Sequence, residues 1–309
     1  MQKYPKLATC CLGLICLIAF ASARAEALAM EKVADGVYVH HGVHEELDEG
    51  YHGDICNIGF IVGKKGVAVV DSGGSYRVGM QLREAIRKVT DLPILYVINT
   101  HVHPDHIFGN AAFKADQPIF VGHAKLADAM ELRKETYLRN NQAWLGEAFA
   151  GSEMIKPALA VASKQELDLG ERTLSLQAWP PAHTSADLTV LDQKTGTLWT
   201  GDLLFVERTP SMDGDTLSWL KIIPDLEKLP AQLAIPGHGA VTKEWQAAME
   251  KEKHYFEILL ADIRSNIKQG ISMEKTMETA AAGERTQWVL FDSVNRRNVN
   301  ILYPKLEWE

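Results

Sequence analysis

The chain has 309 residues, of which 46% are hydrophobic and 23% are charged, with 32 Lys and Arg against 40 Asp and Glu. These globular proportions exclude collagen-like, disordered and low-complexity chains, and the length permits one large domain or two small ones. The net charge of −8 argues against a nucleic-acid partner, because binding phosphates requires clustered Lys and Arg.

The first 25 residues have the composition of a secretory signal. Lys3 and Lys6 precede an apolar run over residues 7–20, and Ala23-Arg24-Ala25 places small residues where a signal peptidase reads. A membrane anchor is the alternative, but the apolar run is shorter than the ~20 residues that a span needs. We therefore expect a Sec-type signal peptide over residues 1–25, cleaved after Ala25, and a periplasmic mature protein.

Cleavage at that point changes both the charge and the cysteine content. It removes three basic residues and no acid, so the formal charge goes from −8 to −11. Of the four cysteines only Cys56 remains, which leaves no intrachain disulfide. An exported protein without disulfides fits a bacterial periplasm when its core is large, and about 284 residues can supply such a core. We expect no membrane association after cleavage.

Strands and helices alternate along the mature chain. Apolar residues at helical spacing predict a helix over residues 76–89, a long helical region over residues 124–149, and a helix over residues 242–268 that Gly270 ends. The alternation predicts an α/β layered fold, with one domain over residues 26–309 and a helical extension from about residue 242. Val- and Ile-rich runs predict the strands, at residues 37–40, 55–62, 66–70, 94–99, 119–121, 172–179, 188–191 and 198–200.

A histidine-rich segment, Thr100-His101-Val102-His103-Pro104-Asp105-His106, follows directly on the strand predicted at residues 94–99. His101 and His103 face the same way, because residues two apart in extended chain share a face. Pro104 breaks the strand, so Asp105 and His106 turn in a second direction. The segment therefore offers ligands to two neighbouring sites, and imidazole with carboxylate suits zinc, with iron or manganese as alternatives. Chance would produce this pattern in about one chain in a thousand of this length.

Three more candidate ligands come after predicted strands: His183, Asp202 and His238. The ends of strands are where an α/β scaffold presents side chains from distant stretches of chain. Each one alone is more often a turn histidine or a capping aspartate. Their order after the histidine segment favours a shared metal site instead.

These residues, in the order Asp71, His101-x-His103-x-Asp105-His106, His183, Asp202, His238, resemble the metallo-β-lactamase fold superfamily. All five sequence motifs of that superfamily are present between residues 71 and 239. The resemblance implies an α/β fold of the four-layer αββα sandwich type, with a dinuclear metal site at one edge of its two sheets.

The resemblance also implies a role for each candidate. Asp71 would be a buried acid that orients the histidine segment, and Asp105 would be catalytic, orienting the attacking water or passing on its proton. Two metals about 3.5–4 Å apart can share a water and lower its pKa towards 7, which gives a nucleophile for a carbonyl group. The implied zinc ligands are His101, His103 and His183 for the first ion, Asp105, His106 and His238 for the second, and Asp202 as the bridge.

Two residues indicate which branch of the superfamily the chain resembles. Asp202 makes the site similar to the glyoxalase II and ribonuclease Z kind, and His103 in place of Glu disfavours the flavodiiron branch. From about Glu31 onward the chain most resembles the exported quinoprotein relay system zinc metallohydrolases, through residues 103–113 and 303–309. This implies a hydrolase of an ester, thioester or lactone in a periplasmic quinoprotein-linked oxidation pathway. Weak β-lactam hydrolysis and a non-catalytic metal-binding accessory protein are the alternatives.

A loop over residues 42–54 would overhang the metals in such a fold. His44 and Tyr51 would either touch the substrate or be solvated loop residues, and the second interpretation is favoured. Cys56 is expected to be a buried packing residue. Lys221 is a less favoured candidate for binding a substrate carboxylate.

Basic residues are scarce near the metal motifs. Arg208, Lys221 and the Arg296-Arg297 pair are the ones that the second half offers, and no cationic clamp is identified. A polyanion such as RNA would therefore be repelled. We expect a small neutral or singly anionic acyl substrate.

Overall fold

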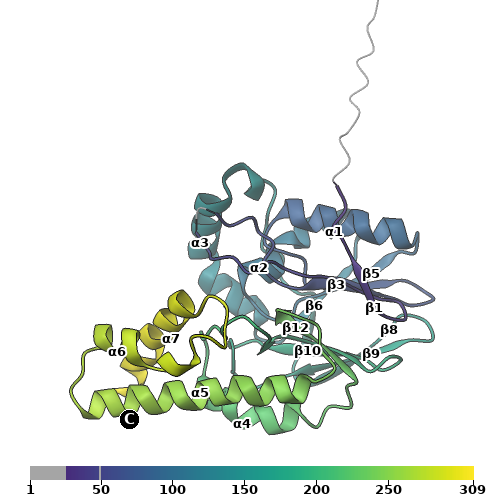
Figure 1. The fold of residues 1–309 in the computed structure, drawn as a ribbon. Coiled ribbons are helices and arrows are strands. Elements are labelled where there is room, and N and C mark those ends of the chain that lie inside the picture. Colours follow the sequence, from purple (N-terminus) through teal and green to yellow (C-terminus); the bar gives the residue numbers. More distant parts are fainter. Residues whose placement is uncertain (1–25, 49) are drawn as a thin grey trace, which may run out of the picture.

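The computed structural model describes residues 26–48 and 50–309. Two β-sheets face each other, and helices cover their outer surfaces (Figure 1). This arrangement confirms the predicted αββα fold class. The signal peptide predicted over residues 1–25 lies outside the described residues. None of the described helices is both long and apolar enough to cross a membrane.

The first sheet has seven strands, whose spatial order follows the sequence. They are β1 (Glu31–Ala34), β2 (Val37–His40), β3 (Ile58–Val62), β4 (Val67–Val70), β5 (Ile94–Ile98), β6 (Ile119–His123) and β7 (Leu159–Val161). β1 to β4 pair antiparallel, whereas β4 to β7 pair parallel because helical crossovers connect them. The carboxyl ends of β4 and β5 therefore lie at the same edge of the sheet.

The second sheet has five strands in the order β12-β11-β10-β9-β8. They are β8 (Lys164–Asp168), β9 (Thr173–Ala178), β10 (Leu188–Asp192), β11 (Thr197–Phe205) and β12 (Leu233–His238). β8 to β11 pair antiparallel, and β12 joins β11 in parallel after a helical crossover.

The predicted strand at residues 198–200 is too short. β11 runs from Thr197 to Phe205 and is buried throughout. It continues past Gly201, whose positive φ of 52° interrupts the regular register with β12 without ending the strand. Asp202 therefore lies inside β11 and not after it.

Seven α-helices and three short 3-10 helices lie among the described residues. The predicted bounds of α1 are confirmed: Ser75 caps its first turn by accepting a hydrogen bond from the Val78 N–H. The region predicted as helical over residues 124–149 contains α3 and η2. The helices are α1 (Tyr76–Val89), α2 (Pro104–Ile107), η1 (Phe108–Asp116), α3 (Leu126–Leu145), η2 (Gly146–Phe149), α4 (Thr216–Leu226), α5 (Trp245–Lys268), α6 (Met273–Thr279), η3 (Ala282–Glu284) and α7 (Phe291–Leu306).

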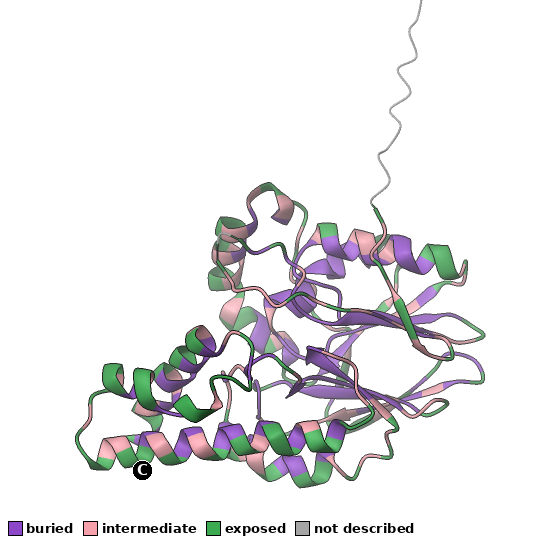
Figure 2. Cartoon of the chain, viewed as in Figure 1, coloured by how far each residue is buried: buried purple, intermediate pink, exposed green. Residues whose placement is uncertain are grey.

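Alternating side chains of the first sheet feed two different cores. In β4, Ala68 and Val70 pack against the second sheet, whereas Val67 and Val69 pack beneath α1. A strand covered on both faces reads as a continuous apolar run, which is what the sequence over residues 67–70 shows. Figure 2 shows the resulting pattern, with buried strands between helices whose outer faces are exposed.

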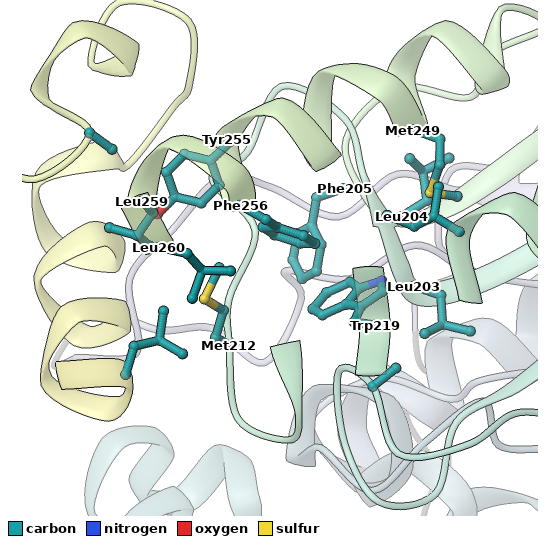
Figure 3. Packing of buried hydrophobic residues seen from close by; sticks show 14 of the residues in the cluster. Leu203, Leu204, Phe205, Met212, Trp219, Met249, Tyr255, Phe256, Leu259 and Leu260 are labelled. Carbon is teal, nitrogen blue, oxygen red and sulfur yellow. The ribbon is translucent and has the colours of Figure 1, made fainter. Parts of the chain in front are cut away.

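A third core lies on the outer side of the second sheet. Phe205, Trp219 and Phe256 pack there with Met249 and Leu260, so that β11, α4 and α5 share one apolar cluster (Figure 3). The C-terminal helices α6 and α7 pack on the far part of α5 and extend this cluster (Figure 1).

Candidate metal centre

The seven predicted ligands lie together in the structure. Each comes from a segment at the end of a strand, inside β11, or in α2. His101 and His103 follow β5, Asp105 and His106 lie in α2, His183 lies between β9 and β10, Asp202 lies in β11, and His238 is the last residue of β12.

One group of candidate ligands consists of His101, His103, His183 and Asp202, whose ligand atoms lie within 4.8 Å of one another. Nδ1 of His103 is 2.9 Å from Nε2 of His183. Oδ2 of Asp202 is 3.2 Å from Nε2 of His183 and 3.7 Å from Nε2 of His101. Three imidazoles and a carboxylate thus converge on one point.

A second group shares Asp202 with the first. Oδ1 of Asp202 is 3.2 Å from Nε2 of His106, and its Oδ2 is 3.4 Å from Nε2 of His238. Oδ2 of Asp105 is 3.4 Å from both of these nitrogens. Asp202 therefore contacts histidines of both groups, which is the position that a bridging carboxylate needs.

Outward hydrogen bonds set the tautomers of the histidines. Nδ1 of His183 donates to the carbonyl of Ser211 at 2.8 Å, and Nδ1 of His238 donates to the carbonyl of Ile55 at 2.7 Å. Because a carbonyl only accepts, the Nε2 of each ring carries its lone pair, and this lone pair faces the centre. The outward bond thereby prepares each ring as a ligand.

Asp71 organises the histidine segment from behind. It follows β4 with a positive φ of 53°, and its carboxylate accepts from Nδ1 of His106 at 2.8 Å. The same carboxylate accepts from the Thr100 N–H at 2.8 Å and from the Thr100 hydroxyl at 2.7 Å. That hydroxyl lies 3.0 Å from Nδ1 of His101. One buried acid thus orients two candidate ligands.

Asp213 supports one of the candidate ligands, and sequence reasoning missed it. Its Oδ2 accepts from Nε2 of His103 at 3.0 Å, which leaves Nδ1 of His103 facing the centre. Arg133 of α3 lies 2.7 Å from the same oxygen. Burial would raise the pKa of Asp213, but His103 and Arg133 outweigh it and hold the pKa below its ordinary value. No local motif marks Asp213, because its partners are far away in the chain.

Burial and charge show what the centre can bind. Nε2 of His101, Nε2 of His106 and Oδ1 of Asp202 are buried without a hydrogen-bond partner among the described residues. Burial alone would raise the pKa of Asp105 and Asp202, but the histidines around them hold it below the ordinary value. Ionised carboxylates and imidazole lone pairs directed at one space would repel each other without a cation. This donor set fits zinc or a similar transition metal.

Local packing positions Asp202. A Cβ on Gly237 would lie 1.8 Å from Oδ1 of Asp202, so only glycine allows β12 to pass this close to the carboxylate. On the other side, the ring of Phe205 stacks on His238 with centroids 5.2 Å apart. Trp219 packs edge-on against His183 at 5.5 Å. Phe205 and Trp219, which Figure 3 labels in the third core, thus hold two of the histidines in place.

A cavity with a volume of about 260 Å³ opens onto the centre. α3 contributes a stripe that includes Arg133, Tyr137 and Trp144, and α7 contributes Arg297 and Ile301. The other lining residues are Leu47, Ile55, His103, Pro104, Asp105, Asn140, Asn141, Asp202, Phe205, Arg208, Ser211, Met212, Asp213 and His238.

The structure differs from three of the expectations about which residues face the substrate. Tyr51 is buried and packs edge-on against Trp144, so it is not a solvated loop residue. Lys221 is exposed on α4 and does not line the cavity. Cationic side chains do line it, namely Arg133, Arg208 and Arg297, two of which come from helices far apart in the sequence.

The other two candidates near the loop lie outside the cavity lining. His44 is 3.5 Å from a carboxylate oxygen of Glu207. Cys56 is buried, as expected, and its thiol donates to the backbone carbonyl of Asp105 at 2.8 Å. Burial raises the pKa of the Cys56 thiol well above its ordinary value. Cys56 thus supports the backbone of the ligand segment from within the core.

The fold and the site together define an αββα protein with a histidine- and carboxylate-lined metal centre where β4, β5 and β12 end. The sequence profile of the Metallo-beta-lactamase superfamily matches residues 52–238. The chain therefore belongs to that superfamily. The match ends at His238, the last of the predicted ligands.

Similar proteins include sulfatases and lactamases. A linear primary-alkylsulfatase from Pseudomonas sp. (strain ATCC 19151) is 34% identical over 62 residues, which are 20% of this chain and 12% of that enzyme. The stereoselective inverting sec-alkylsulfatase from Pseudomonas sp. superposes with a TM-score of 0.69 at 14% identity, over 90% of this chain and 50% of that one. A metallo-beta-lactamase from Pontibacter korlensis superposes with a TM-score of 0.58 at 18% identity, over 74% of this chain and 99% of that one. The match thus spans half or less of each sulfatase, and the solved structures share the fold alone.

Proposed function

We propose that the protein is a dinuclear zinc hydrolase that cleaves a small ester, thioester or lactone. The observation that carries this proposal is the set of outward hydrogen bonds on the five histidines, which leaves one nitrogen of each ring facing Asp202 or a neighbouring ligand. His101, His103 and His183 would hold one zinc, Asp105, His106 and His238 the other, and Asp202 both.

The metals would supply Lewis-acid activation of a water and of the substrate carbonyl. The residues of the chain would do the rest. Asp105 lines the cavity with an ionised carboxylate, so it can orient the attacking water and take up its proton. Trp144, Leu47 and Ile301 line the same cavity and would exclude bulk water from the scissile bond.

The place of this reaction is part of the proposal. The signal predicted at residues 1–25 and the resemblance to quinoprotein relay system metallohydrolases both favour a periplasmic enzyme that serves a quinoprotein-linked oxidation pathway. Iron or manganese in place of zinc, weak β-lactam hydrolysis and a non-catalytic accessory role are the alternatives that experiment must separate.

Sulfate-ester hydrolysis is a second candidate. It is favoured by the similarity to two alkylsulfatases, one in sequence and one in fold. Both candidates use the same metal centre, so only the choice of substrate separates them.

Metal content and a substrate panel test the proposal together. Elemental analysis of purified protein should give about two metal ions per chain, because the donor set exceeds what one zinc requires. Asp202→Asn should weaken metal binding and lower activity at least about tenfold, since the bridge loses its charge. Asp225→Asn is the matched control, because Asp225 is exposed and pairs with Lys228 on the surface.

The panel should contain activated esters, thioesters, lactones, cephalosporins and a primary alkyl sulfate. Metal-dependent turnover of a carboxylic ester or lactone supports the proposal, and turnover of the alkyl sulfate alone supports the second candidate. Bound metal with no turnover of any of them would leave the accessory role. One metal ion or fewer per chain, even after zinc addition, would contradict the dinuclear centre.

A further inference from the structure

Arg208 is a buried cation on the wall of the metal-site cavity. It follows β11, and its N–H donates to the carbonyl of Val206, which fixes the start of its side chain. The residue is 5% exposed, and it lines the same cavity as Asp105 and His238. A guanidinium remains charged at any physiological pH, so its burial requires compensation by an anion.

The protein supplies little of that compensation. One guanidinium nitrogen, Nη1, donates to the backbone carbonyl of Glu45 at 3.0 Å. Nε is buried with no hydrogen-bond partner in the described part of the chain, where no carboxylate forms an ion pair with Arg208 either. Burial accordingly lowers the pKa of Arg208 from its ordinary value.

Arg172 shows how this fold treats another buried arginine. It is 4% exposed, and its Nε and Nη2 bind both oxygens of Asp192 at 2.9 and 2.6 Å. Its remaining donors reach the backbone carbonyls of Val62 and Asp35. Arg172 is a closed structural ion pair, whereas Arg208 has unused donors beside a cavity.

Three carboxylates attract Arg208 electrostatically, and each of them has another partner. Asp105 and Asp202 attract it, but both belong to the metal centre. The third, Glu46, accepts from Nη1 of Arg297 at 2.9 Å and from the hydroxyl of Ser293. With metals bound, the guanidinium therefore faces the cavity with no anion of its own.

We propose that Arg208 binds an anionic group of the substrate, so that the substrate is a small acyl compound with a carboxylate or sulfonate besides its scissile bond. This rests on the proposed function. A guanidinium binds such groups through two parallel N–H donors, which also fixes their orientation. Leu47, Trp144 and Met212 line the same cavity, and they suit an apolar chain between the anionic end and the scissile bond.

A matched pair of esters tests the proposal. The 4-nitrophenyl monoester of adipic acid carries a terminal carboxylate too far from the ester to attack it readily, and 4-nitrophenyl heptanoate is a neutral counterpart of similar size. For the wild-type enzyme we expect kcat/KM to be at least about tenfold higher for the charged ester. Arg208→Gln should lower this ratio at least about tenfold, and Arg208→Lys should lower it less, because charge remains while the two-pronged geometry is lost.

Arg264→Gln is the matched control, since Arg264 is on the surface and pairs with Glu309. It should keep the wild-type ratio. A second measurement avoids turnover altogether: calorimetric titration of the zinc-loaded protein with benzenesulfonate. Wild type and Arg264→Gln should bind this anion, and Arg208→Gln should bind it at least about tenfold more weakly.

The outcomes separate the two proposals. Hydrolysis of both esters at equal efficiency by the wild type, with no binding of the sulfonate, overturns the anion site and leaves the hydrolase intact. Sulfonate binding that depends on Arg208, without hydrolysis of any ester, overturns the proposed function and keeps the anion site. If Arg208→Gln does not fold, the wild-type ratio and the Arg208→Lys variant still decide.

Discussion

The carboxylate of Asp71 lies 2.8 Å from Nδ1 of His106, on the side of the ring opposite the candidate metal position. The bond requires Nδ1 to carry the proton, so Nε2 is left as a lone pair. A residue that contacts no metal position therefore decides whether His106 can act as a ligand.

Asp71→Asn should weaken binding of the metal at His106 about 10- to 100-fold. An amide that presents its NH₂ to the ring favours the opposite tautomer, whose Nε2–H cannot bind metal. Zinc affinity is measured by competition with a chromophoric chelator. Glu31→Gln is the control, because it removes an acid–histidine pair with His41 that is exposed. Equal zinc affinity in Asp71→Asn and wild type would contradict the role of Asp71.

Gly237→Ala should disrupt the centre without a change of charge. Its Cβ would lie 1.8 Å from Oδ1 of Asp202, so the carboxylate or β12 must move. We expect a loss of at least about tenfold in zinc affinity and in activity, with the fold retained by circular dichroism. Gly283→Ala is the control, since nothing lies within 4 Å of its added Cβ. Full metal binding by Gly237→Ala would show that β12 has more freedom here than this contact allows.

Glu252 in α5 should make stability depend on pH. Burial raises its pKa well above the ordinary value of about 4.5. The hydrogen bond that its carboxylate accepts from the Phe205 N–H opposes this rise. The folded state therefore binds a proton that the unfolded state has lost. The contribution of this group to stability is complete below about pH 4.5 and is lost as pH rises through the folded-state pKa.

Urea unfolding of metal-free protein at about pH 5 and about pH 8 measures this effect. Between the two pKa values the group lowers the free energy of unfolding by up to about 1.4 kcal/mol per pH unit. Glu252→Gln cannot titrate and should show a shallower pH dependence than wild type. Glu250→Gln, on the exposed side of α5, should keep the wild-type dependence. Equal slopes in all three proteins would mean that Glu252 is ionised in the fold.

Export is tested by the N-terminus of the mature chain. Protein expressed from the full sequence should be found in the periplasm and begin at Glu26, because Ala23 and Ala25 suit signal peptidase. Mass spectrometry of the intact protein from separated fractions makes the measurement. An uncleaved chain in the cytoplasm would refute both the cleavage site and the location.

The sequence predicts the fold class and the positions of the ligands because both depend on local patterns. The apolar run at residues 67–70 marks a strand buried on both faces, and the segment from His101 to His106 carries four candidate ligands within six residues. Such signals need no knowledge of what lies across the molecule. The buried position of Asp71 behind the histidine segment is what the resemblance to the superfamily implies, and the structure places it there.

The residues that complete the site depend on distant contacts and therefore leave no local pattern. Asp213 meets His103 across 110 positions of the chain. Tyr51 lies in a polar, acidic loop that reads as solvated, and its burial results from packing against Trp144 of α3. The cationic lining is invisible for the same reason, because Arg133 and Arg297 come together only through the fold.

α7 forms part of the wall of the metal-site cavity. The profile shared with the superfamily stops at residue 238, yet Arg297 and Ile301 of α7 line the wall of the cavity. Part of the cavity wall thus comes from a helix outside the stretch that the superfamily profile matches. Changes at the cavity-facing positions of α7 could redirect such an enzyme to another compound while every candidate ligand stays in place.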